Sequence, residues 1–133
     1  MNLKRFIKTA IAISSVLLLF GSSVYAGTSM KPYDTTVGRF NGSGYTGYQT
    51  KTYTSDKGLL YSNSVGGNYT VDVRLVSSKG KTAKWVRDVD DNTYYSIPTN
   101  KDSIKAGNSV RLQFSNDITT PVAVQVAGEW ESN

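Results

Sequence analysis

The sequence predicts an all-β protein, and three observations support this prediction. The chain has 9 tyrosines and 12 glycines among its 133 residues and is rich in threonine and serine, a composition that suits pleated strands and turns. After residue 26, no long window repeats its apolar residues with the period of a helix. Several segments instead alternate apolar and polar residues, as half-buried strands do. We therefore expect an antiparallel β-sandwich, jelly-roll or immunoglobulin-like, of seven to eight short strands, with a closed barrel as the alternative.

Residues 1–26 have the three parts of a secretory signal peptide, which would leave residues 27–133 as a single β-sandwich domain. A basic head precedes an apolar run over residues 10–20, and the small residues Val24 and Ala26 lie before the expected cut after Ala26. The run is shorter than the roughly 20 residues that span a bilayer, so we expect cleavage and a secreted, extracellular product. We take the short lysine-headed leader as a sign of a bacterial source.

The absence of cysteine and histidine excludes several kinds of chemistry. Disulfides, a thiol nucleophile, a zinc finger and a histidine-based catalytic triad are all ruled out. A chain without cysteine also lacks the attachment point of a bacterial lipid anchor, so we expect no stable membrane anchor after cleavage. The leader holds three of the 15 basic residues and none of the 10 acidic ones. The remaining charge is nearly balanced and scattered, which predicts no nucleic-acid partner.

Four segments are the strongest strand candidates because they alternate in polarity or follow a clear turn. They are residues 68–77, 82–89, 110–114 and 122–130. In the last of these, Trp130 is in phase with three valines, and we expect both Trp130 and Trp85 to lie in the core.

Four weaker strand candidates are separated by turns rich in glycine, asparagine, aspartate and serine. They are residues 35–40, 45–54, 59–65 and 93–97. The longest connection, residues 98–108, is expected to cross between the sheets and to hold one helical turn near residues 102–105.

Exposed tyrosines are the candidate ligand-binding residues, because an aromatic ring with a polar edge suits sugars and protein partners. Residues 45–54 have no apolar face, so we expect their side chains to be exposed. Tyr94 and Tyr95 are adjacent, so at least one of them should face outward. The predicted ligand-binding residues are Tyr45, Tyr48, Tyr53 and Tyr95, with Arg39, Lys51 or Arg111 assisting through charge or hydrogen bonds. The alternative is that these tyrosines pack across strands for structural reasons.

The segment Asp88 to Asn92 is the only acidic cluster in the sequence. Oxygen ligands at alternate positions of a turn suit calcium, and Asp88, Asp90 and Asp91 are the candidate ligands. Thr93 stands where a helical calcium loop needs glycine, so that motif is excluded. The alternative is a plain turn built from good turn formers, with no cofactor.

No arrangement of residues in the sequence indicates an enzyme. The only glutamates are Glu129 and Glu131, which lie two residues apart on one strand face, whereas glycoside hydrolysis needs two acids facing each other across a cleft. We therefore predict a small secreted, non-enzymatic β-sandwich that binds an extracellular partner such as a cell-wall glycan, a surface polymer or a protein. The alternative is a secreted bacteriocin-like or toxin-like protein that acts on the envelope of neighbouring cells.

Overall fold

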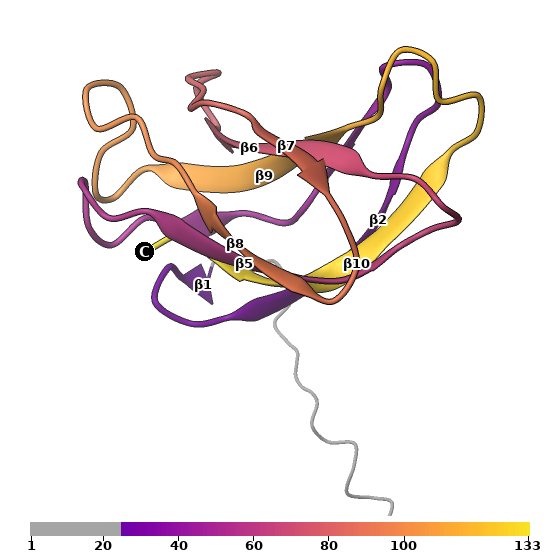
Figure 1. The fold of residues 1–133 in the computed structure, drawn as a ribbon. Helices are drawn as coiled ribbons and strands as arrows, with labels where there is room; N and C mark the ends of the chain where they lie inside the picture. Colours follow the sequence, from indigo (N-terminus) through magenta and orange to yellow (C-terminus); the bar gives the residue numbers. More distant parts are fainter. Residues whose placement is uncertain (1–24) are drawn as a thin grey trace, which may run out of the picture.

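The computed structural model describes residues 25–133, and every regular element in this range is a β-strand. The strands form two sheets that face one another in two layers (Figure 1). The all-β prediction is therefore confirmed for the described residues, and the two sheets do not close into a barrel there. Within the same range no helix is long and apolar enough to cross a membrane. Residues 1–24, which hold most of the predicted leader, lie outside the described residues.

The first sheet has six strands, and the long strand β9 lies at its centre. Its order is β1–β4–β9–β6–β7, and β3 also pairs with β9. Strands β1 and β4 are parallel, whereas the other pairs are antiparallel. The strands are β1 (Tyr25–Ala26), β3 (Ser43–Tyr45), β4 (Gln49–Thr50), β6 (Val71–Ser77), β7 (Val86–Val89) and β9 (Ser109–Ser115). Strand β1 falls inside the predicted leader.

The second sheet has four antiparallel strands in the order β2–β10–β5–β8. The strands are β2 (Lys31–Val37), β5 (Gly58–Val65), β8 (Thr93–Ile97) and β10 (Val124–Glu131). A bulge interrupts the β10–β5 pairing between Ala127 and Gly128. Because β10 pairs on both sides, it is a central strand of this sheet.

A single hydrophobic core fills the space between the sheets. The first sheet contributes Leu75, Leu112 and Phe114, and the second contributes Leu60 and Trp130. These side chains are almost fully buried because they occupy the apolar positions of alternating strands, whose polar positions face outward. The predicted core position of Trp130 is confirmed.

The described residues form ten strands, more than the seven to eight predicted, and two predicted strands differ most from the observed ones because the chain turns within them. The candidate at residues 35–40 ends at Val37, since Phe40 and Asn41 adopt positive φ angles of 53° and 64° in a turn. The candidate at residues 45–54 divides into β3 and β4, because Thr46 hydrogen-bonds to the main chain of Leu112 through both its N–H and its hydroxyl and leads the chain into a loop. The helical turn in the longest connection is observed slightly earlier than predicted, with Ile104 N–H donating to the carbonyl of Asn100 (2.7 Å).

Buried amide side chains join the two sheets at opposite ends. Asn116 follows β9 of the first sheet, and its Nδ2 donates to the carbonyl oxygens of Val37 (3.1 Å) and Gly38 (2.9 Å), at the end of β2. Gln49 in β4 donates to the carbonyl of Trp130 (2.8 Å) in β10. Each amide thus hydrogen-bonds across the two sheets to main-chain carbonyls, so its own buried donor is satisfied.

Candidate functional site

The outer surface of the six-stranded sheet carries a group of aromatic and arginine side chains, which we name the tyrosine–arginine face. It consists of Tyr45, Tyr48, Arg74, Trp85, Arg111 and Gln113. The pairing of the strands explains why these residues meet. Gln113 of β9 is the register partner of Arg74 in β6 on one side and of Tyr45 in β3 on the other, so the three side chains share one face of the sheet.

Arg111 contacts both of the tyrosines that the sequence singled out on this face. Its guanidinium carbon lies 4.0 Å from the centre of the Tyr45 ring and 4.8 Å from that of Tyr48. Cation–π contacts of this kind fix the orientation of the rings. Tyr45 remains 39% exposed, so the arginine holds a pre-oriented aromatic surface at the boundary with solvent.

Arg74 extends the same face toward β7. Its guanidinium carbon lies 4.3 Å from the centre of the Trp85 ring, and its Nε donates to Oε1 of Gln113 (2.8 Å). Gln113 in turn donates from Nε2 to the hydroxyl of Ser43 (3.1 Å). The prediction that Trp85 is a core residue is therefore wrong: Trp85 is only half-buried, because it lies against arginines outside the sheet and not between the sheets.

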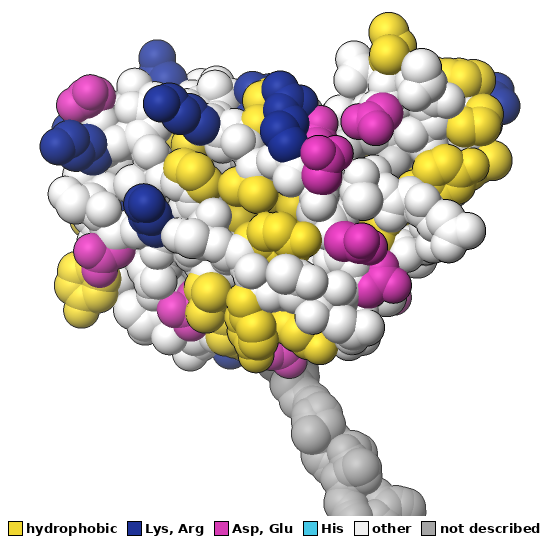
Figure 2. Space-filling model, viewed as in Figure 1, with side chains coloured by type: hydrophobic (Ala, Val, Ile, Leu, Met, Phe, Trp, Pro, Cys, Tyr) yellow, Lys and Arg dark blue, Asp and Glu magenta, His cyan; other side chains and the backbone are white. Residues whose placement is uncertain are grey.

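An open hollow of about 320 Å³ lies beside these side chains. Its lining has no aspartate or glutamate and consists of Tyr45, Tyr48, Arg74, Val76, Ser77, Ser78, Gly80, Thr82, Arg111 and Gln113. The lysine-bearing turn after β6 adds further positive charge nearby. In Figure 2, Lys and Arg side chains gather on the side of the molecule where this sheet lies, whereas a hydrophobic patch lies over the other sheet.

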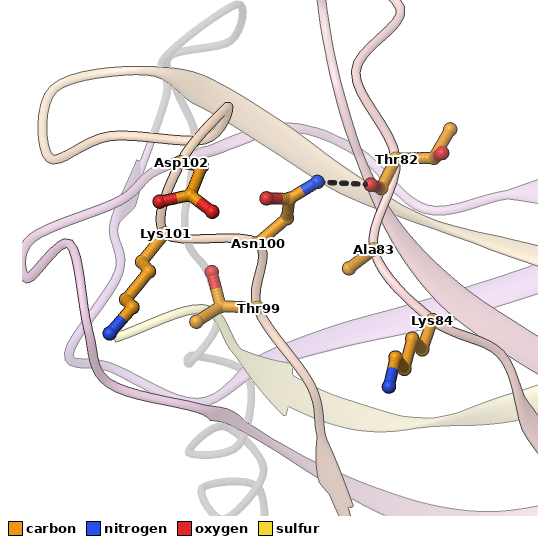
Figure 3. A pocket seen from close by; sticks show the side chains of 7 residues that line it. All are labelled: Thr82, Ala83, Lys84, Thr99, Asn100, Lys101 and Asp102. Atoms are coloured by element: carbon orange, nitrogen blue, oxygen red, sulfur yellow. Dashed lines mark hydrogen bonds between the residues drawn. The ribbon is translucent and has the colours of Figure 1, made fainter.

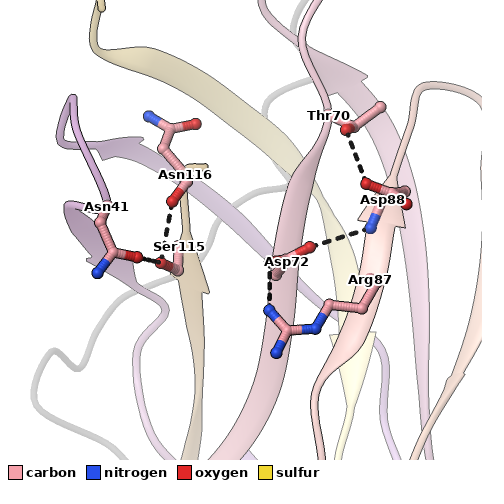
Figure 4. Close-up of polar contacts among 7 residues, drawn as sticks. All are labelled: Asn41, Thr70, Asp72, Arg87, Asp88, Ser115 and Asn116. Carbon is pink, nitrogen blue, oxygen red and sulfur yellow. Dashed lines mark hydrogen bonds and ion pairs between the residues drawn. The ribbon is translucent and has the colours of Figure 1, made fainter. Parts of the chain in front are cut away.

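The third arginine of this sheet, Arg87, has a carboxylate partner. Its Nη1 lies 2.6 Å from Oδ2 of Asp72, and Asp72 also accepts a hydrogen bond from the main-chain N–H of Asp88 (Figure 4). This is the only ion pair among residues 25–133 for which both partners are described. Arg74 and Arg111 therefore have no carboxylate partner in that range.

The structure places the other predicted ligand-binding residues elsewhere. Tyr53 is exposed in the loop after β4 and does not line the hollow. Tyr95 is half-buried against the core, and its hydroxyl accepts a hydrogen bond from the main-chain N–H of Asp90 (2.9 Å). Its neighbour Tyr94 is the one that faces outward, with 64% of its surface exposed.

Lys51, which the sequence suggested as an exposed helper, is fully buried. Its Nζ donates to the main-chain oxygens of Asp56 (2.6 Å) and Ser132 (3.0 Å). Burial lowers the pKa of this ammonium group, and the nearby negative charge of Asp56 opposes part of that change. Lys51 therefore joins β4 to the end of β10 and does not reach a ligand surface. Arg39 is exposed and lies over the ring of Phe40, 5.5 Å from its centre.

Of the aspartates suggested as calcium ligands, Asp88 lies in β7, and Asp90 and Asp91 lie in the turn between β7 and β8. Asp88 has a positive φ of 58° and accepts a hydrogen bond from the hydroxyl of Thr70. Asp90 accepts one from the main-chain N–H of Asp91 (2.8 Å), as aspartate often does in turns. Among the described residues, no three His, Cys, Asp or Glu side chains are grouped closely enough to hold a metal ion.

Two further surface features are alternatives to the tyrosine–arginine face. On the four-stranded sheet, Tyr61 and Tyr94 stack with ring centres 4.7 Å apart beside Asp34 and Glu129. The second feature is a hollow of about 640 Å³ between the chain before β7 and the loop after β8. Figure 3 shows its lining, in which Asn100 donates to the carbonyl of Thr82 (3.0 Å). That hollow has no aromatic wall, so it offers less to a ring-shaped ligand.

Sequence reasoning missed Arg74, Trp85 and Gln113 as members of the site. A signal was present in the alternation of the strands. Arg74 and Arg111 both occupy polar positions of strongly alternating segments, and polar positions of neighbouring antiparallel strands share one face of the sheet. The missing information was which strands are neighbours.

Comparisons with known proteins leave the site to be interpreted from its own geometry. No protein-family model matches the chain, and no curated protein is significantly similar to it.

Proposed function

We propose that this protein is a small secreted, non-enzymatic β-sandwich that binds an extracellular polymer, most simply a cell-wall glycan, through the tyrosine–arginine face. The observation that supports the proposal is the contact of Arg111 with two partly exposed tyrosine rings on an open sheet surface. The proposal includes a jelly-roll or immunoglobulin-like sandwich and the removal of the leader after Ala26.

The geometry favours a flat, ring-containing ligand. Tyrosine rings stack on the apolar faces of sugars, while arginine and glutamine side chains donate hydrogen bonds to sugar oxygens. Arg111 already holds the two tyrosine rings, and Gln113 already holds Arg74. Little conformational entropy of these side chains is therefore lost when a ligand binds.

Retention on purified cell walls and on insoluble polysaccharides tests the proposal. We expect Tyr45→Ala and Tyr48→Ala to reduce retention by about tenfold or more, as the loss of an aromatic anchor does at other binding surfaces. Tyr53→Ala and Tyr94→Ala are the matched controls, since both remove an exposed tyrosine outside this face. Urea unfolding of each variant verifies that the fold is intact.

Two outcomes would contradict the proposal. Unchanged retention of both Tyr45→Ala and Tyr48→Ala would exclude this face as the binding surface. Loss of retention in Tyr94→Ala alone would assign binding to the opposite sheet.

A further inference from the structure

The positive charges of Arg74 and Arg111 at the hollow are not balanced by a carboxylate among the described residues. The Nε of Arg111 is buried and has no hydrogen-bond partner there, and neither Arg111 nor Arg74 has a carboxylate partner in the described range. Arg74 donates from Nε to Gln113 and makes no hydrogen bond from its terminal nitrogens to a described residue. Arg111 likewise makes no side-chain hydrogen bond to a described residue, and both arginines line the same hollow.

The rest of the lining suits an anion. The lining also includes the uncharged residues Ser78, Gly80 and Thr82. Because no acidic side chain lines the hollow, nothing there would repel a negative group. Guanidinium groups present forked N–H donors that match the oxygens of a phosphate or a carboxylate.

We propose that the hollow binds an anionic group, a phosphate or a carboxylate, carried by an extracellular glycan or wall polymer. This inference rests on the proposed function and names the class of its ligand. In the bound state, Arg74 and Arg111 donate to the anion while Tyr45 and Tyr48 contact the adjoining ring of the polymer. A nucleic acid is disfavoured because the chain beyond the leader is nearly balanced in charge, and binding to nucleic acid needs a markedly basic domain.

Titration of the secreted form with four defined polymers tests this inference. Poly(glycerol phosphate) carries phosphate, polygalacturonate carries carboxylate, dextran is neutral, and single-stranded DNA represents nucleic acid. Affinity is measured by calorimetry for the wild type and for Arg74→Gln, which removes one charge and leaves the contacts of Arg111 with both tyrosines in place. Lys105→Gln is the matched control, because it removes an exposed positive charge outside the hollow.

We expect binding to at least one of the two anionic glycan-type polymers, and stronger binding there than to dextran or DNA. Arg74→Gln should weaken it by about tenfold or more, since a hydrogen bond to a charged group contributes strongly. The slope of log K against log salt concentration should also fall by about one for the lost arginine. Lys105→Gln should retain the wild-type affinity. The preferred polymer then identifies the phosphate or the carboxylate as the source of the anion.

The outcomes that overturn the inference differ from those that overturn the proposed function. Wild-type binding to the anionic polymers that is no tighter than binding to dextran, and that is unchanged in Arg74→Gln, would refute the anion while leaving polymer binding in place. Equal losses of affinity in Arg74→Gln and Lys105→Gln would show that the attraction is non-specific. Binding that is tightest to DNA would indicate nucleic acid as the partner and would also overturn the inference. A wild type that binds neither these polymers nor cell walls would refute both proposals.

Discussion

Replacement of Asn116 by alanine tests whether a buried amide holds the two sheets together at one end. The Nδ2 of Asn116 donates to the carbonyl oxygens of Val37 and Gly38, and the residue is 1% exposed. Alanine at this position removes both hydrogen bonds and leaves the carbonyl of the buried Val37 without this donor. We therefore expect Asn116→Ala to lower the free energy of unfolding.

The size of the effect follows from the two bonds. The part-buried hydrogen bond to Gly38 contributes about 1 kcal/mol net, and the buried carbonyl of Val37, left without its donor, costs about 1–3 kcal/mol in lost solvation. Together these give a loss of about 2–4 kcal/mol. Small domains unfold with roughly 5–15 kcal/mol, so the change is a large part of the total. For a domain of this size it should lower Tm by roughly 10–20 °C.

Urea unfolding followed by tryptophan fluorescence measures this loss, because Trp130 is buried in the core. Asn68→Ala is the matched control, since Asn68 is exposed and should change stability by less than about 0.5 kcal/mol. A midpoint for Asn116→Ala equal to that of Asn68→Ala would refute the view that this amide joins the sheets.

Three further predictions concern the buried charge, the bulge and the ion pair. Burial lowers the pKa of Lys51, so the unfolded chain binds more protons than the folded chain at pH values between that lowered pKa and about 10.4. The free energy of unfolding should therefore rise with pH in this window for the wild type but not for Lys51→Met. Urea midpoints at several pH values measure this difference. Gly128→Ala should destabilise by about 2 kcal/mol or more in the same assay, because its Cβ would collide with the main chain of β5; a neutral result would mean that the bulge can relax. Asp72→Ala should cost more stability than Arg87→Ala, since Asp72 is buried and also accepts a hydrogen bond from Asp88 N–H, whereas Arg87 is exposed; the reverse order would contradict this assignment.

The core could be predicted from the sequence because alternation is a local property. Trp130 follows three valines at two-residue intervals, and the structure buries it with Val124 and Val126. The same argument fails for Trp85, whose segment has no clear alternation. Trp85 lies where Arg74 and Arg87 of the first sheet cover its ring, and these contacts depend on how β6 and β7 pair.

Lys51 shows most clearly what the sequence could not supply. A lysine between threonines in a polar segment predicts exposure, since charged side chains are rarely buried without partners. Its partners are main-chain oxygens, and one of them belongs to Ser132, 81 residues away along the chain. The candidate site has the same property: Tyr45 and Tyr48 could be named from the sequence, but their convergence on Arg111 depends on the pairing of β3 and β4 with β9.

The order of the four-stranded sheet has a consequence for the timing of folding. Strand β10 comes last along the chain, yet it separates β2 from β5 and provides hydrogen-bonding partners to both. During synthesis β2 and β5 lack their shared neighbour until β10 has left the ribosome. This sheet therefore reaches its native pairing late, after most of the described residues have been synthesised.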